Sequence, residues 1–190
     1  MKNYLVVGAS SGIGKELVSV FNREEYKVYG TYRNTPIQEK ASGVEYHFLD
    51  VTEDTLNLDF LPDRIDGLAY CPGTINLKPF ARIKPEDFID DFNIQVLGAV
   101  KGLVRAPAAE FVPKIRVNCI APSITYTPLS SGLFNSDAKL EAYGQRHPMK
   151  RVGSVQDIAQ MAAFLLSDKS KWITGQVYGV DGGIFSLKVN

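Results

Sequence analysis

Apolar residues in this chain gather in short runs, and a glycine-containing turn follows several of them. Four runs occupy the first half of the chain: 3–9 (NYLVVGA), 26–32 (YKVYGTY), 44–51 (VEYHFLDV) and 65–73 (IDGLAYCPG). Two more follow later, at 114–123 (KIRVNCIAPS) and 175–183 (GQVYGVDGG). Short runs rich in β-branched and aromatic residues are typical of strands buried in a parallel sheet. The pattern therefore predicts about six strands.

Between these runs the apolar residues recur every three or four positions, which is typical of helices with one buried face. One helix is predicted from about Ile13, and another is led in by Pro85, which suits a first helical turn. A third is predicted over 153–166, where Ser154 and Asp157 have the spacing of a capping box. Strands that alternate with helices predict an α/β fold, a Rossmann-like doubly wound parallel sheet, in a single domain spanning residues 1–190.

The stretch 93–111 (NIQVLGAVKGLVRAPAAEF) has helical spacing but also contains a helix breaker near its end. The ring of Pro107 would clash with the carbonyl of Leu103 and remove a hydrogen bond, at a cost of roughly 3 kcal/mol. A single uninterrupted helix is therefore not expected there.

Composition excludes several classes of partner. The chain has 190 residues, of which 45% are hydrophobic, with 21 basic and 21 acidic side chains. With equal numbers of basic and acidic side chains, the chain has no net positive charge that would attract nucleic acid or an anionic membrane. No apolar run approaches the roughly 20 residues that span a bilayer, and the first run is too short for a signal peptide. We expect a cytoplasmic protein in which Cys71 and Cys119 are buried free thiols.

The segment GASSGIG, residues 8–14, joins the first predicted strand to the first predicted helix. A glycine-rich turn in this position, with helix N–H groups behind it, is suited to binding a dinucleotide pyrophosphate. The alternative is a turn with incidental glycines. The expected cofactor-binding residues of this loop are Gly8, Ser10, Ser11, Gly12, Ile13 and Gly14.

Arg33, just after the second predicted strand, indicates which dinucleotide would bind. NAD sites usually carry an acidic residue there for the ribose hydroxyls, whereas this chain reads GTYRN. A guanidinium could pair with a 2′-phosphate and stack on the adenine, which favours NADP(H). An exposed arginine with no such role is the alternative.

These motifs, in this order, resemble the short-chain dehydrogenase/reductase family over nearly the whole chain. GASSGIG matches the family's cofactor loop, and LDV (49–51) matches its Asp-Val pair. The resemblance implies that Asp50 contacts the adenine with Val51 packed beside it. CPG, formed by Cys71, Pro72 and Gly73, stands where the family usually has Asn-Ala-Gly, and only the glycine agrees.

The second half carries two more matches. RVNCIAPSITYTPL (116–129) is similar to the family's RVNxIxPGxxxTPL segment, with Ser123 in place of the glycine. The match implies that Pro122 and Ile124 line a nicotinamide pocket and that Thr127 touches the carboxamide or the pyrophosphate. ITGQVYGVDGG (173–183) resembles the family's closing strand. In the first half of the chain, Asn93 matches an asparagine to which the family gives a structural or catalytic role.

The family's proton-transfer motif is absent from the sequence. The family uses a serine and a Tyr-x-x-x-Lys pair, but none of the 9 tyrosines here has a lysine four positions later. Residues before 98–100 resemble one family helix and those after resemble the end of the next. The chain therefore reads as if one central strand and the catalytic turn were missing, on the order of 50 residues in a domain of this class.

Whether the chain is an enzyme stays open at this point. By resemblance it would transfer hydride between NADP(H) and a small carbonyl or alcohol, although it lacks the usual catalytic groups. Two alternatives are a non-catalytic NADP(H)-binding sensor or scaffold and an inactive, oligomerising remnant. Of the two histidines, His47 fits a core or edge position on a strand, whereas His147 is a candidate for substrate contact.

Overall fold

The computed structural model describes residues 1–34, 36–37, 42–53, 55–73, 82–97 and 114–187. These residues group into two compact units. The first takes in the described parts of Met1–Ser10 and Phe21–Ala106, and the second those of Ser11–Val20 and Pro107–Asn190. Helix α1 (Gly12–Arg23) contributes to both units. The expectation of a single domain stays a prediction.

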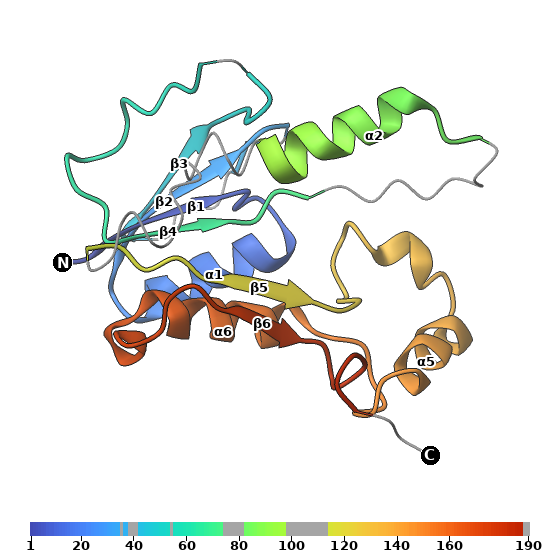
Figure 1. The fold of residues 1–190 in the computed structure, drawn as a ribbon. Helices are drawn as coiled ribbons and strands as arrows, with labels where there is room; N and C mark the ends of the chain where they lie inside the picture. Colours follow the sequence, from blue (N-terminus) through green and yellow to red (C-terminus); the bar gives the residue numbers. More distant parts are fainter. Residues whose placement is uncertain (35, 38–41, 54, 74–81, 98–113, 188–190) are drawn as a thin grey trace. The chain divides into compact units, whose positions relative to one another are not determined.

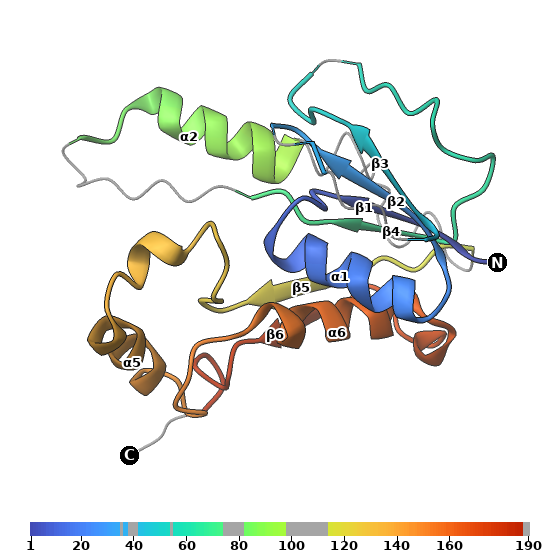
Figure 2. The same ribbon diagram turned by 180° about the vertical axis from the view of Figure 1, so that it is seen from behind.

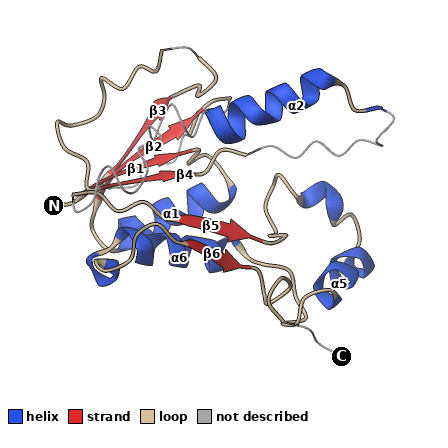
Figure 3. Cartoon of the chain, viewed as in Figure 1, coloured by secondary structure: helices blue, strands red, loops and turns tan. Residues whose placement is uncertain are grey.

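The first unit is built on a four-stranded parallel sheet (Figures 1 and 3). Its strands are β1 (Asn3–Val7), β2 (Lys27–Tyr32), β3 (Val44–Phe48) and β4 (Gly67–Tyr70). Their order is β3-β2-β1-β4, so β1 lies at the centre and the chain crosses over it to reach β4. This order reverses direction between β1 and β4, which is the topological switch point of doubly wound folds.

Apolar side chains of alternate strand positions form the core of the first unit. Leu5 and Val7 of β1 pack with Tyr29, Leu49 and Val51 in one buried cluster. Tyr4 stacks on Phe21 at a centroid distance of 4.3 Å. The continuous apolar runs of the sequence are therefore explained by a sheet whose central strand is buried on both faces.

Helix α2 (Pro85–Phe92) follows β4 and continues into a π-helical turn, Asn93–Leu97. Pro85 occupies its first turn as expected, and the Asp87 carboxylate accepts a hydrogen bond from the Lys84 N–H at 3.0 Å. The junction expected at 98–100 and the break expected at Pro107 lie outside the described residues.

The second unit contains a two-stranded parallel sheet of β5 (Cys119–Pro122) and β6 (Val177–Val180). Helix α6 (Val155–Leu166) runs beside β5, as Figure 2 shows from behind. Its predicted capping box is confirmed, because the Ser154 hydroxyl accepts from the Asp157 N–H at 3.3 Å while the Asp157 carboxylate accepts from the Ser154 N–H at 2.8 Å.

Three sequence-based expectations for this unit need correction. The strand expected over 114–123 is shorter, because only Cys119–Pro122 pair with β6. Cys119 is exposed instead of buried, since the described residues pair β5 with one neighbour and leave this position open. Helix α5 (Asp137–Gln145) was not expected; Ser136 caps it by accepting from the Lys139 N–H at 3.3 Å.

The expected α/β fold is confirmed, and the described residues hold six strands divided between the two sheets. Among these residues, no helix has the length and apolar character needed to cross a membrane.

Trp172, the chain's only tryptophan, is fully exposed, with 100% of its surface accessible.

Candidate functional site

The carboxyl ends of β1 and β4 meet at Gly8, the residue after β1. The Cys71 N–H donates to the Val7 carbonyl at 3.0 Å, which extends the pairing of the two strands. Gly8 has a φ of +80°, and a Cβ placed there would lie 3.1 Å from the Pro72 nitrogen. A side chain at position 8 would therefore be strained and crowded, so the switch point requires glycine.

A residue that sequence reasoning missed holds the other side of this turn. Thr31 of β2 is 1% exposed, and its hydroxyl accepts from the Gly8 N–H at 3.2 Å. Its carbonyl accepts from the Ala9 N–H at 2.7 Å. Thr31 therefore fixes the entry into the glycine-rich loop. Nothing in the local sequence sets it apart from other strand threonines.

The residues expected at the adenine end come together at the ends of β2 and β3. Arg33 is exposed and donates through Nε to the Asn34 side chain at 3.3 Å. The pKa of Asp50 is lowered, chiefly by hydrogen bonds from Thr52 and also by the charge of Arg33. Val51 beside it is buried in the core. At this edge of the sheet, the Asp50 carboxylate and the Arg33 guanidinium therefore interact electrostatically.

Asn93 lies where α2 becomes the π-helical turn. Its N–H donates to the carbonyls of Asp90 and Ile89. The Tyr70 hydroxyl, from the end of β4, donates to the Ile94 carbonyl at 2.5 Å. Burial raises the pKa of Tyr70 to about 12, which keeps this phenol a donor. π-Turns are frequent at functional sites, and here one such turn is tied to the sheet next to Asn93.

In the second unit, the first turn of α1 lies against Thr127. Gly12 has a φ of +56°, and a Cβ there would be 3.6 Å from two Thr127 side-chain carbons. Ser130, a second residue that sequence reasoning missed, is buried and holds this loop. Its hydroxyl accepts from the Thr127 N–H at 2.9 Å and donates to the Thr125 carbonyl at 2.6 Å.

The remaining expected residues occupy turns at strand ends and the start of α1. Within the first unit these are Ser10, which is half-buried, and Gly73, which is exposed. Within the second unit they are Ser11 (exposed), Ile13 (half-buried), Gly14 (buried), Pro122 (exposed) and Ile124 (half-buried). The structure thus brings together Gly8 with Pro72, Arg33 with Asp50, and Gly12 with Thr127.

The two histidines differ in their surroundings. His47 lies on the edge strand β3, stacked on Phe60 at a centroid distance of 4.2 Å, as expected for a structural position. His147 is 2% exposed. Its Nε2 is 2.9 Å from the Ser123 hydroxyl, and its Nδ1 is 2.9 Å from the Tyr143 carbonyl. Sequence reasoning did not pair Ser123 with His147.

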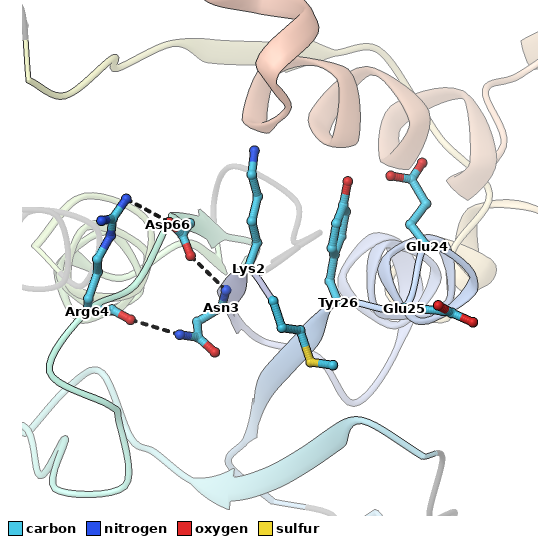
Figure 4. Close-up of a pocket in the computed structure, with 8 residues that line it drawn as sticks. Lys2, Asn3, Glu24, Glu25, Tyr26, Arg64 and Asp66 are labelled. Carbon is cyan, nitrogen blue, oxygen red and sulfur yellow. Dashed lines mark hydrogen bonds and ion pairs between the residues drawn. The ribbon is translucent and has the colours of Figure 1, made fainter.

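A pocket of about 760 Å³ lies at the opposite edge of the first unit's sheet, where β1, β2 and β4 begin (Figure 4). Asn3 donates there to Asp66 and to the Arg64 carbonyl, and Arg64 pairs with Asp66 at 3.1 Å. None of the expected site residues lines this pocket. Ligands of doubly wound sheets bind at the carboxyl ends of the strands, so this pocket is not the candidate cofactor site.

The sequence was compared with protein families and with individual known proteins. A family model described as enoyl-(acyl carrier protein) reductase matches residues 97–185. A glucose 1-dehydrogenase of Gluconobacter oxydans is 39% identical over 88 residues, which cover 46% of this chain and 33% of that protein. The 3-oxoacyl-[acyl-carrier-protein] reductase FabG of Buchnera aphidicola is 38% identical over 96 residues, covering 50% and 38%. The matched stretches thus span little more than a third of these relatives.

Solved structures match over more of the chain. A short-chain dehydrogenase family protein of Francisella tularensis superposes with a TM-score of 0.84 at 23% identity, covering 98% of this chain and 100% of that one. ElxO with NADP bound superposes with a TM-score of 0.82 at 24% identity, covering 98% of this chain and 99% of the ElxO chain. A 4-hydroxyisoleucine dehydrogenase complexed with NADH superposes with a TM-score of 0.83 at 20% identity, covering 99% of this chain and 100% of that chain. At these identities the likeness establishes the fold.

The family model, the sequence relatives and the solved structures together support the short-chain dehydrogenase/reductase family.

Proposed function

We propose that this protein binds NADP(H) and transfers hydride between the nicotinamide and a small carbonyl or alcohol substrate. The observation that carries the cofactor proposal is the switch-point turn, where Gly8 has a positive φ and packs against Pro72 without room for a side chain. Such a turn lets backbone N–H groups approach a pyrophosphate. The residues present therefore fit a dinucleotide.

Each unit offers its own part of the binding residues. In the first unit, Asp50 and Val51 would hold the adenine end, and Arg33 would pair with a 2′-phosphate. In the second unit, the start of α1 would receive the pyrophosphate, while Pro122, Ile124 and Thr127 would line the nicotinamide. The remaining expected residues are the loop residues Gly8 to Gly14 and the strand-end residues Cys71, Pro72 and Gly73. Asn93 is proposed as a catalytic or structural residue.

Titration of the protein with NADPH and with NADH tests the cofactor proposal. We expect enhanced nicotinamide fluorescence at lower concentrations of NADPH than of NADH. Carbonyl-dependent loss of the NADPH signal over a panel of aldehydes and ketones tests the hydride transfer. No fluorescence change with either nucleotide would contradict both parts.

A non-catalytic NADP(H) sensor is the second candidate, because no tyrosine of the chain has a lysine four positions later. Binding of NADPH without turnover of any carbonyl would support the sensor and exclude the oxidoreductase. A homo-oligomer and a cytoplasmic location stay predictions, as does the absence of nucleic acid or membrane among the partners.

A further inference from the structure

The family's tyrosine–lysine pair is absent from the sequence, so hydride transfer would need another proton donor. We propose that the Ser123 hydroxyl is this donor and that His147 supplies its proton. The inference rests on the proposed function. Ser123 stands between Pro122 and Ile124, two residues proposed to line the nicotinamide.

Hydrogen bonds in the second unit fix the orientation of the His147 ring. A backbone carbonyl can only accept, so the Nδ1 atom, 2.9 Å from the Tyr143 carbonyl, must carry a hydrogen. In the neutral ring Nε2 is then an acceptor, and the Ser123 hydroxyl at 2.9 Å donates to it. The ring also packs against the turn after β6, where a Cβ on Gly182 would lie 3.5 Å from two His147 carbons.

The protonation state of His147 therefore decides what Ser123 can do. When the ring is neutral, the serine proton points at Nε2, and the serine oxygen can only accept from other groups. When the ring is protonated, Nε2–H donates to the serine oxygen, and the serine proton becomes free to be given to another atom. A third group that orients the base of a hydroxyl–base pair is the usual arrangement of an activated serine.

Ser123 is open to a small molecule, whereas His147 is not. Ser123 is half-buried, and the pair lines a cavity of about 170 Å³ together with Ile124 and Met149. Three charged groups face the same cavity. Arg151 and Asp157 neutralise each other in a two-bond ion pair with a shortest distance of 2.6 Å, and Asp181 accepts from the Gly183 N–H at 2.9 Å.

Carbonyl reduction consumes one hydride and one proton. When bound, the reduced cofactor would supply a hydride, and hence the electron pair that reduces the carbonyl carbon, and would itself be oxidised. The carbonyl π bond breaks, and its oxygen takes the Ser123 hydroxyl proton. The serine oxygen recovers a proton from protonated Nε2, which leaves a neutral ring with its hydrogen on Nδ1. Water reprotonates the pair through Ser123 after the alcohol leaves.

The experiment combines kinetics with a measurement that needs no cofactor. Because rising pH removes the proton from His147, we expect the reduction rate of the wild-type protein to fall as the pH rises and the alcohol oxidation rate to rise. Ser123→Ala should lower kcat roughly 100-fold with little change in KM, and Ser123→Thr, which keeps a hydroxyl, should restore most of it. His147→Gln should abolish the pH dependence, and His47→Gln, at the chain's other histidine, should leave it intact.

Long-range ¹H–¹⁵N NMR spectra of the cofactor-free protein report the tautomer directly. We expect neutral His147 to carry its hydrogen on Nδ1, with an Nε2 signal that shifts in Ser123→Ala. An Nε2–H tautomer at alkaline pH would overturn the relay, as would turnover unchanged in Ser123→Ala. A wild-type protein that binds NADPH but reduces no carbonyl overturns the relay together with the proposed oxidoreductase function, whereas unchanged turnover in Ser123→Ala leaves that function standing.

Discussion

The hydroxyl of Thr31 accepts a hydrogen bond from the backbone N–H of Gly8 at 3.2 Å, and this bond joins β2 to the turn that ends β1. A buried N–H that loses its acceptor retains the full cost of its desolvation. Position 31 therefore controls the turn although it belongs to a different strand.

Thr31→Val keeps the volume and removes the acceptor. We expect a loss of about 1–3 kcal/mol in the free energy of unfolding, measured by urea denaturation, together with weaker NADPH binding. Thr31→Ser is the control, because it keeps the hydroxyl and loses only a methyl group. Equal stability of the valine variant and the wild type would show that the Gly8 N–H finds another partner.

The Gly8 turn itself is tested by Gly8→Ala. The added Cβ combines a positive φ with a 3.1 Å approach to the Pro72 nitrogen, so we expect a destabilisation of about 2 kcal/mol or more. Gly132→Ala is the matched control, because a Cβ there meets nothing within 4 Å. Urea denaturation of the two variants should separate them clearly, and similar curves would contradict the strained turn.

Arg33→Ala tests the choice between the two dinucleotides. A charge-assisted hydrogen bond to a 2′-phosphate contributes about 1.5–3 kcal/mol, so the Kd for NADPH should rise roughly 10- to 100-fold. The Kd for NADH should change little, since NADH lacks that phosphate. Arg33→Lys keeps the charge and should recover part of the loss. An equal effect on both nucleotides in fluorescence titrations would remove the argument for NADP(H).

The ion pair of Arg151 with Asp157 predicts a dependence of stability on pH. Hydrogen bonding to Arg151 and to Ser154 holds the pKa of the Asp157 carboxyl well below its ordinary range. Because the unfolded carboxyl titrates near pH 3.9, this contribution is complete above that pH and is lost as the pH falls toward the folded pKa. Asp157→Asn should therefore reduce stability at pH 7 more than at pH 3 in urea titrations. A constant difference between the two proteins would contradict this.

The two cysteines should differ in reactivity. Burial raises the pKa of the Cys71 thiol to about 12, whereas Cys119 is exposed. Since the thiolate is the nucleophile, iodoacetamide at pH 8 should modify Cys119 and spare Cys71 in the folded protein. Mass spectrometry of the intact protein should show one adduct under native conditions and two in urea. Early modification of Cys71 would mean that its surroundings open readily.

The sequence was most informative where a local rule acts over a few residues. The capping box of Ser154 and Asp157 is satisfied within four residues, and the start of α6 follows from it. The apolar runs at β1 and β2 locate these two strands because a strand buried on both faces has little polar content. Helix α5 could not be predicted from the sequence, because its residues show only a weak separation of apolar and polar faces.

Side-chain hydrogen bonds between residues far apart in the chain could not be predicted from the sequence. Ser123 and His147 are 24 residues apart, as are Tyr70 and Ile94, and Thr31 is 23 residues from Gly8. Each bond depends on where the backbone of another element ends. The residue types at these positions are ordinary in strands and loops, so no spacing marks them.

Because Trp172 is fully exposed, its fluorescence will reveal little about the folding of this protein. A solvated indole has nearly the same surroundings in the folded and unfolded chain, so its emission will report little of the transition between them. The optical signature of the native state will instead come from the rings of Tyr4, Phe21 and Tyr26, which contact one another in the first unit. Near-ultraviolet circular dichroism should therefore register the loss of this packing while the tryptophan spectrum hardly moves.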